Sequence, residues 1–466
     1  MILDIENNFN ELTVSYFNKE GNIRLKKYKL TEEQCSNWRI CSESDSKKSN
    51  QFRNWDGKAV KKVKDKRLQK FSIYEFINNL EDEDKDEIIG FHLPKIQSVD
   101  IETEVIDSFP DPTIARERIT TIAISTETNK TIVLGWKQIS KEQEKEIFDK
   151  HREYLKNFGD WDFKYICFED EFNMMYTFVN KFIPNFSVMI GWNFMNFDWK
   201  YIYNRCKKLG IDITAASPSR KVQGNDNILM HVGIIDYLDI YRRWDRTVAI
   251  KESNSLDFVA NAVLGTTKLK YNGTLQELYD NDYDKYILYN AVDAALVSLI
   301  HRKLKTLNMV FSIGCICSIP IYRASSAVNV TEALLWKGYY KRNQVIADDR
   351  TEKVKGSYEG AYVKEPEPGM FKAATCFDYA SLYPSIMRQY NVSPESFLRK
   401  EQNQQNLEKY RQDPNFVVSV TGAIYDNSKV SVLKEILTDL YTERKTNKNR
   451  GLDIERSLIK ITKKNA

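Results

Sequence analysis

Two carboxylates separated by one residue, Asp100 and Glu102, stand at the end of the apolar stretch IQSVDIE. Residues two apart in a strand point to the same face, so this spacing places both acids side by side. Burial disfavours the charged forms of neighbouring carboxylates unless a cation lies between them. The pair therefore indicates a metal site at the end of a strand.

Two further acids stand where they could join this pair. Asp198 follows the apolar string SVMIGW in a turn, and Asp293 lies four residues after Tyr289 in a long helical pattern, so Tyr289 and Asp293 share a helix face. Together, four acids from three elements predict a site for two divalent ions that activates water for phosphodiester cleavage, with Tyr289 orienting the water or the phosphate. Each motif alone also occurs among solvated or capping residues, and that alternative stays open here.

The elements that must position these acids alternate between strand and helix from about residue 96. ERITTIAIST and KTIVLGW are typical of strands, and EDEFNMMYTFVNKFIPNF has helical spacing before a proline stop. The alternation predicts a mixed sheet flanked by helices. Residues 306–350 are mainly helical in pattern, and the Gly/Pro-punctuated stretch 356–371 marks a boundary.

Length and composition bound the class of protein. A chain of 466 residues is long enough for two to four domains, and its 69 Lys and Arg against 65 Asp and Glu exclude a wholly basic wrapper of nucleic acid. The sequence has no apolar stretch long enough to span a membrane, and its acidic N-terminus differs from a signal peptide. We therefore expect a soluble cytoplasmic protein whose seven scattered cysteines are buried, reduced thiols.

A basic segment near the N-terminus, residues 47–67, carries Phe52 and Trp55 among lysines and arginines. Aromatic rings between cations can stack on single-stranded bases, so these two residues are candidates for nucleic-acid binding. A solvated loop or helix face has the same composition, and the sequence does not decide between the two.

Four strings resemble the motifs of one family. DIE (100–102), NFMNFD (193–198) and YNAVD (289–293) resemble the three exonuclease motifs of the DnaQ-like 3′→5′ proofreading domain, and DYASLYPSI (378–386) resembles motif A of the family B DNA polymerases. Three flanking strings are similar to the T-even phage type: KLKYNG (268–273), GAYVKEPEPG (360–369) and RQYNVSPE (388–395). The resemblance implies an α/β and α+β multidomain chain with an RNase H-like exonuclease domain.

The resemblance also implies a domain order. It comprises an N-terminal domain in two segments (1–95 and 306–350), the exonuclease domain (96–305), the first part of the palm (351–430) and the first, incomplete fingers helix (431–466).

For the site residues, the resemblance implies two Mg²⁺ or Mn²⁺ ions per active site. Asp100, Glu102, Asp198 and Asp293 would hold the exonuclease pair, with Tyr289 assisting the attacking water, and Asp378 would bind both metals of nucleotidyl transfer. The implied dNTP-binding residues are Ser381, Leu382 and Tyr383 beside the triphosphate and sugar, with Arg444 and Lys448 reaching the triphosphate from the fingers helix.

The family's motif C, its second fingers motif and its thumb do not occur in this sequence. One palm carboxylate cannot hold two polymerase metals. We therefore expect the N-terminal subunit of a naturally split replicative DNA polymerase, or a fragment of a longer one, in a phage-infected bacterial host. The expected partners are primer-template and single-stranded DNA, dNTPs and a C-terminal subunit with motif C and the thumb, through which alone a sliding clamp would bind. Alternatives are a stand-alone 3′→5′ exonuclease and a regulatory RNA-binding protein with a non-functional palm.

Overall fold

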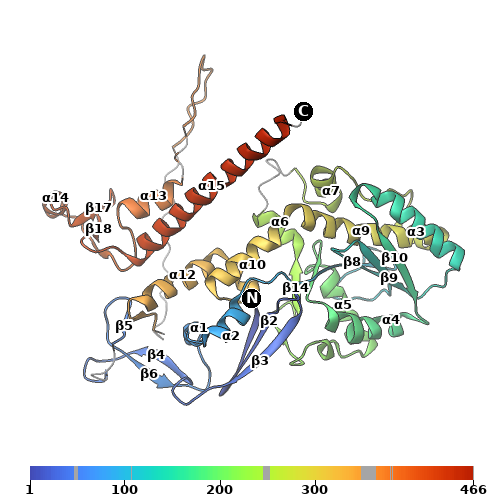
Figure 1. Ribbon diagram of the computed structural model, residues 1–466, viewed down its shortest axis with the longest axis horizontal. Coiled ribbons are helices and arrows are strands. Elements are labelled where there is room, and N and C mark those ends of the chain that lie inside the picture. The colour runs from blue at the N-terminus through green and yellow to red at the C-terminus, as the bar shows by residue number, and fades with distance from the viewer. Residues whose placement is uncertain are drawn as a thin grey trace. The chain divides into compact units, whose positions relative to one another are not determined.

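The computed structural model describes residues 1–46, 51–106, 108–244, 252–347, 364–377, 379 and 381–464 (Figure 1). The chain packs as two compact units. The first unit joins Met1–Thr31 to Tyr74–Val330, and the second joins Glu32–Ile73 to Thr331–Ala466. This division runs through the predicted N-terminal domain, and the five segments of the domain order taken from the resemblance stay a prediction.

A six-stranded mixed sheet forms the centre of the first unit, in the order β10-β9-β8-β7-β11-β14. The two middle pairings, β7 with β8 and β8 with β9, are antiparallel, whereas the outer pairings are parallel. The strands are β7 (Ile96–Thr103), β8 (Ile119–Thr126), β9 (Lys130–Gly135), β10 (Asp162–Cys167), β11 (Val188–Gly191) and β14 (Gly233–Asp236). The predicted mixed sheet is confirmed.

Helices follow the strands of this sheet. Their bounds are α3 (Lys141–Leu155), α4 (Glu171–Thr177), α5 (Asp198–Leu209), α6 (Tyr237–Trp244), α7 (Leu256–Leu264), α8 (Leu275–Asn281), α9 (Tyr283–Leu304), α10 (Thr306–Cys317) and α11 (Ile321–Ala324). Local sequence explains several ends. Ser140 and Gln143 form a capping box at the start of α3, the Asp282 side chain caps α9, and Gly210 adopts the left-handed conformation that ends α5.

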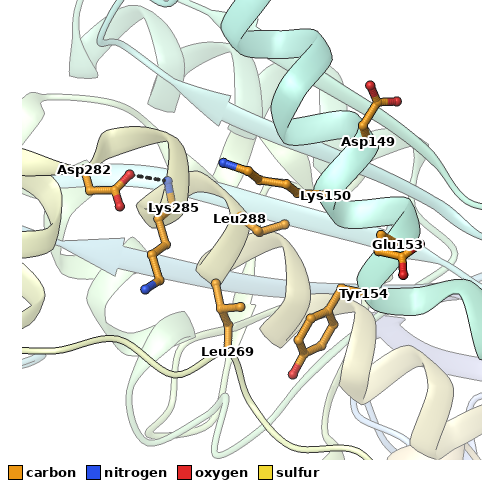
Figure 2. Close-up of a pocket in the computed structure, with 8 residues that line it drawn as sticks. All are labelled: Asp149, Lys150, Glu153, Tyr154, Leu269, Asp282, Lys285 and Leu288. Carbon is orange, nitrogen blue, oxygen red and sulfur yellow. Dashed lines mark hydrogen bonds between the residues drawn. The ribbon is translucent and has the colours of Figure 1, made fainter.

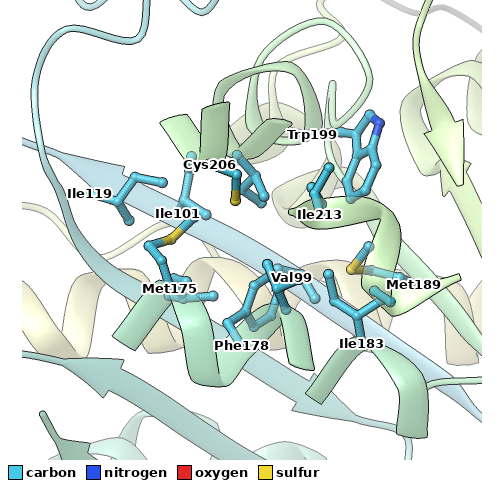
Figure 3. Close-up of a cluster of buried hydrophobic side chains, with 14 of the residues drawn as sticks. Val99, Ile101, Ile119, Met175, Phe178, Ile183, Met189, Trp199, Cys206 and Ile213 are labelled. Atoms are coloured by element: carbon cyan, nitrogen blue, oxygen red, sulfur yellow. The ribbon is translucent and has the colours of Figure 1, made fainter. Parts of the chain in front are cut away.

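Strand β7 separates the apolar core from the acids. Val99 and Ile101 are buried in a cluster that α4 and α5 complete, as Figure 3 shows with Met175 and Cys206. Asp100 and Glu102 alternate with these residues and therefore face the other side of the sheet, where α9 packs. The alternation along β7 thus determines which face of the strand presents the two carboxylates.

The rest of the first unit is a three-stranded antiparallel sheet, β1 (Ile2–Asn8), β2 (Glu11–Phe17) and β3 (Ile23–Lys29), with helix α2 (Asp82–Ile89). The first unit also contains a short antiparallel hairpin, β12 (Val222–Gln223) with β13 (Ile228–Leu229). Two residues that flank this hairpin contact Glu6 of β1. Lys221 forms an ion pair with Glu6, and Nε2 of His231 lies 3.2 Å from Glu6 Oε2.

The second unit contains the sequence that resembles the palm and fingers. Three strands, β16 (Phe397–Lys400), β18 (Ala423–Asp426) and β17 (Phe416–Val418), pair antiparallel in that order. Its other elements are β4 (Ser36–Ile40), β5 (Arg53–Asn54), β6 (Val60–Lys64), β15 (Gln344–Val345), α13 (Leu382–Gln389), α14 (Gln404–Gln412) and α15 (Val432–Lys464). Helices α1 (Lys70–Asn78) and α12 (Ala327–Lys341) carry the chain between the two units.

None of the helices in the described part of the chain combines the length and apolar character needed to cross a membrane. All seven cysteines are free thiols. Cys35, Cys206 and Cys317 are buried as expected, whereas Cys376 is exposed.

Candidate active site

The structure brings three of the four predicted exonuclease acids together. Carboxylate oxygens of Asp100, Glu102 and Asp293 all lie within 4.8 Å of one another. Asp100 and Glu102 come from β7, and Asp293 comes from the middle of α9, which packs on the same face. This arrangement agrees with the strand and helix periods read from the sequence.

The fourth acid, Asp198, is the first residue of α5 and is buried beside this group. Its Oδ1 accepts a hydrogen bond of 3.1 Å from the backbone N–H of Ile101, the residue between Asp100 and Glu102. The end of β11, from which the turn to α5 begins, fits tightly against β7, because a Cβ at Gly191 would lie 2.7 Å from the Val99 carbonyl oxygen. Glycine therefore allows the close approach that brings Asp198 to the strand.

Crowding of the four carboxylates disfavours their charged forms. Burial raises the pKa of Asp100 well above its usual range, and the charges of Asp198 and Glu102 raise it further. Burial also raises the pKa of Glu102 to about 8, with Asp293 adding to the rise. For Asp198 burial raises the pKa to about 7, although the Ile101 N–H opposes this shift. A cation placed among these groups would favour their charged forms.

A lysine that the sequence reasoning did not single out reaches into this group. Nζ of Lys268 lies 2.5 Å from Asp293 Oδ2 and 4.8 Å from the centre of the Tyr289 ring. Its backbone N–H donates to Asp257 Oδ1 at 2.6 Å, which fixes the segment before α8. Burial raises the pKa of Asp293, and Lys268 opposes that rise. No spacing rule marked Lys268, because it lies in an irregular segment.

The four acids provide a donor set that suits a hard divalent cation. Carboxylate oxygens are the ligands that Mg²⁺ and Mn²⁺ prefer. Asp293 Oδ1 is buried and has no hydrogen-bond partner among the described residues, so one oxygen at the centre of the group is unsatisfied by protein atoms. The residues present therefore fit a divalent metal.

Tyr289 lies on α9 one helical turn before Asp293, and its predicted role in assisting the attacking water stays a prediction. Its ring contacts that of Tyr271 edge to face, with centroids 5.2 Å apart. Burial raises the pKa of Tyr289, and the charge of Asp293 adds to this effect, so the hydroxyl keeps its proton at neutral pH.

A separate cavity of about 740 Å³ lies between α3 and α9 (Figure 2). Tyr154, Lys285 and Leu269 are among its lining residues, and none of the four acids lines it. Leu269 follows Lys268 in sequence, so one segment borders both the cavity and the acid group. The acids themselves lie outside this cavity.

In the second unit, two of the predicted nucleotide-binding residues meet. Nη1 of Arg444 on α15 donates to Ser381 Oγ at 3.2 Å, next to the start of α13. Tyr383 and Leu382 are exposed, and Lys448 is exposed one turn after Arg444. Asp378 lies outside the described residues, so its predicted role in metal binding stays a prediction.

The two aromatic residues of the basic segment are partly buried. Phe52 packs between Trp38 and Tyr340, with ring centroids 5.2 and 5.4 Å away. The Trp55 backbone N–H donates to the Val345 carbonyl oxygen. This packing gives the Phe52 ring a structural role, and nucleic-acid binding by Phe52 and Trp55 stays a prediction.

Comparison with known proteins identifies the family of the chain. Residues 48–257 match the family described as DNA polymerase family B, exonuclease domain, and residues 318–458 match DNA polymerase family B. The DNA-directed DNA polymerase of Escherichia phage RB69 is 30% identical over 311 residues, which cover 63% of this chain and 34% of the relative. That of Enterobacteria phage T4 is 28% identical over 300 residues, covering 60% and 33%.

A solved structure shares the fold. The family B DNA polymerase of Pyrobaculum calidifontis superposes with a TM-score of 0.64 at 17% identity, over 97% of this chain and 64% of that one. The chain belongs to the family B DNA polymerases and carries their exonuclease domain and the start of their palm. It spans about a third of the length of the two phage relatives.

Proposed function

We propose that the first unit is a 3′→5′ proofreading exonuclease that removes nucleotides from DNA with two Mg²⁺ or Mn²⁺ ions. The observation that carries this proposal is the group of carboxylates from β7 and α9, with Asp198 bonded to the same strand. Asp100, Glu102, Asp198 and Asp293 would hold the ions.

When bound, the ions supply activation of the attacking water and stabilisation of the leaving oxygen. The chain's own residues hold the water, the phosphate and the metal ligands in place. Tyr289 retains its proton and orients the water or the scissile phosphate by donating a hydrogen bond. Lys268 brings a positive charge to the same place, where it offsets the charge of Asp293 and attracts the phosphate. The rigid strand β7 keeps two of the acids at a fixed separation.

A 5′-labelled single strand of DNA tests this proposal. Wild-type protein with Mg²⁺ is expected to shorten the strand progressively from its 3′ end, and Asp198→Ala is expected to abolish shortening while DNA affinity, measured by fluorescence anisotropy, stays close to that of the wild type. Unchanged degradation by Asp198→Ala would reject the assignment of the acids.

We further propose that the second unit is part of a DNA polymerase site that uses dNTPs and primer-template DNA. The Arg444–Ser381 contact supports this, because it joins the fingers helix α15 to the motif A string. Arginine suits recognition of a polyphosphate in this setting. Synthesis is proposed for this chain together with the polypeptide that carries motif C and the thumb, as a partner subunit or as the continuation of a longer chain.

A further inference from the structure

Asn290 is a buried amide directly beside the acid group. Its Nδ2 donates to Asp100 Oδ2 at 2.8 Å and to the Asp100 backbone carbonyl oxygen at 3.3 Å. The residue has no exposed surface, and its Oδ1 has no hydrogen-bond partner among the described residues. Both polar atoms of this amide are thus shielded from water, but only Nδ2 has a hydrogen-bond partner.

Such an amide is costly for folding. A buried polar atom without a partner lowers the stability of the folded state, and the residues that follow Asn290, Ala291 and Val292, are apolar and fully buried. Helix α9 already contacts the sheet through a hydrogen bond between the Tyr286 and Thr120 hydroxyls. Stability alone therefore gives no reason for asparagine at this position.

We propose that Asn290 is a positioning residue of the nuclease site, which holds the Asp100 carboxylate in the orientation that binds a divalent cation. This inference rests on the proposed exonuclease function. By occupying Oδ2 from the α9 side, the amide restricts rotation of the carboxylate and leaves Oδ1 available to the ion. Residues behind metal ligands commonly act in this way.

The amide of Asn290 carries no charge, and this affects how strongly Asp100 can bind a cation. A lysine at the same place would satisfy Asp100 but would also offset its negative charge, as the ammonium of Lys268 does for Asp293. An amide donor orients the carboxylate while leaving its negative charge for the metal. Asp198 is held by the same kind of neutral donor, the backbone N–H of Ile101.

The test is titration with Mn²⁺ alone, followed by electron paramagnetic resonance, on the full chain. The informative variant is Asn290→Leu, which keeps the branched shape and removes the donor, and Asn290→Ala is a second variant that cannot clash. Leu299→Ala is the matched control, because Leu299 is buried on α9 in a different cluster, with Leu155, Trp161 and Ala295. Asp100→Ala removes the ligand itself, and thermal unfolding without metal is recorded for each variant.

We expect both Asn290 variants to bind Mn²⁺ about tenfold more weakly than the wild type, as is usual for loss of a partner behind a ligand. Leu299→Ala should unfold at a lower temperature but keep wild-type Mn²⁺ affinity. Wild-type affinity in both Asn290 variants, with weakened binding in Asp100→Ala, would overturn the role of Asn290 alone. Wild-type affinity in Asp100→Ala would contradict the metal site itself and with it both proposals.

Discussion

The ammonium of Lys268 lies 2.5 Å from Oδ2 of Asp293, inside the group of acids that we propose as a metal site. Burial disfavours its charged form, but the charge of Asp293 and the Tyr289 hydroxyl outweigh burial and raise the pKa of Lys268 above its usual range. The lysine is thus a fixed positive charge in a place where four carboxylates would otherwise repel one another. We therefore expect Lys268 to stabilise the acid group when no metal is bound.

Replacing Lys268 by methionine should destabilise the metal-free protein by about 2 kcal/mol, because the buried Asp293 carboxylate loses its charged partner. Mg²⁺ should restore much of that loss, since it can neutralise the same acids. Urea unfolding in Mg²⁺ and in EDTA measures both effects.

Lys270→Met is the control for this prediction, because Lys270 is exposed in the same segment. It should change neither value. An equal loss of stability for Lys268→Met in the two buffers would show that Lys268 and the metal do not act on the same charges.

A second prediction concerns the buried ion pair that joins α5 to α4. Arg205 donates to both carboxylate oxygens of Glu171, at 2.8 and 2.6 Å, and also to the backbone carbonyl oxygens of Ala115 and Arg116. Removing one member of such a pair strands a buried charge. Arg205→Met should therefore lower the free energy of unfolding by about 3–5 kcal/mol.

Adding Glu171→Gln to Arg205→Met should recover part of this loss, because a neutral amide replaces the stranded charge and can still accept from the Ile119 N–H. Chemical denaturation of the single and double variants gives the comparison. A double variant less stable than Arg205→Met would mean that the carboxylate contributes chiefly through its other contacts.

A third prediction concerns pH. His151 is fully buried between Trp161 and Phe163, and neither ring nitrogen has a hydrogen-bond partner in the described part of the chain. Burial lowers its pKa from 6.5 to about 4. Between these values the unfolded chain binds the proton and the folded chain does not, so stability rises with pH across this window and is complete above about 6.5.

The loss on acidification from pH 7 to 4 should reach about 3 kcal/mol from this residue. His151→Leu should flatten that part of the stability profile, measured by thermal or urea unfolding at each pH. If the profiles of wild type and variant fall in parallel, His151 does not carry the acid sensitivity.

The sequence predicted the central sheet and the side-by-side placement of residues within each element because both depend on local periods. The period of two in β7 placed Asp100 and Glu102 together, and the helical period of α9 placed Tyr289 and Asp293 on one face. The resemblance to family motifs also indicated the Arg444 and Ser381 region, and the structure adds their contact.

Other features depend on tertiary packing, which local periods do not encode. Lys268 enters the site from an irregular segment, and Asn290 faces Asp100 only because α9 packs on β7. The sequence indicated Phe52 as an aromatic ring available to stack on bases. In the structure it packs between Trp38 and Tyr340, which lie far apart in the sequence. Such partners are fixed by the fold rather than by neighbours in sequence.

The measurement that tests the central claim most directly is a denaturing gel of a 5′-labelled primer on a template, incubated with this chain alone and Mg²⁺, with and without dNTPs. The proposed exonuclease predicts progressive shortening from the 3′ end that dNTPs do not reverse and that EDTA stops. A primer that stays intact with Mg²⁺, or that shortens equally in EDTA, would contradict a metal-dependent nuclease built from Asp100, Glu102, Asp198 and Asp293.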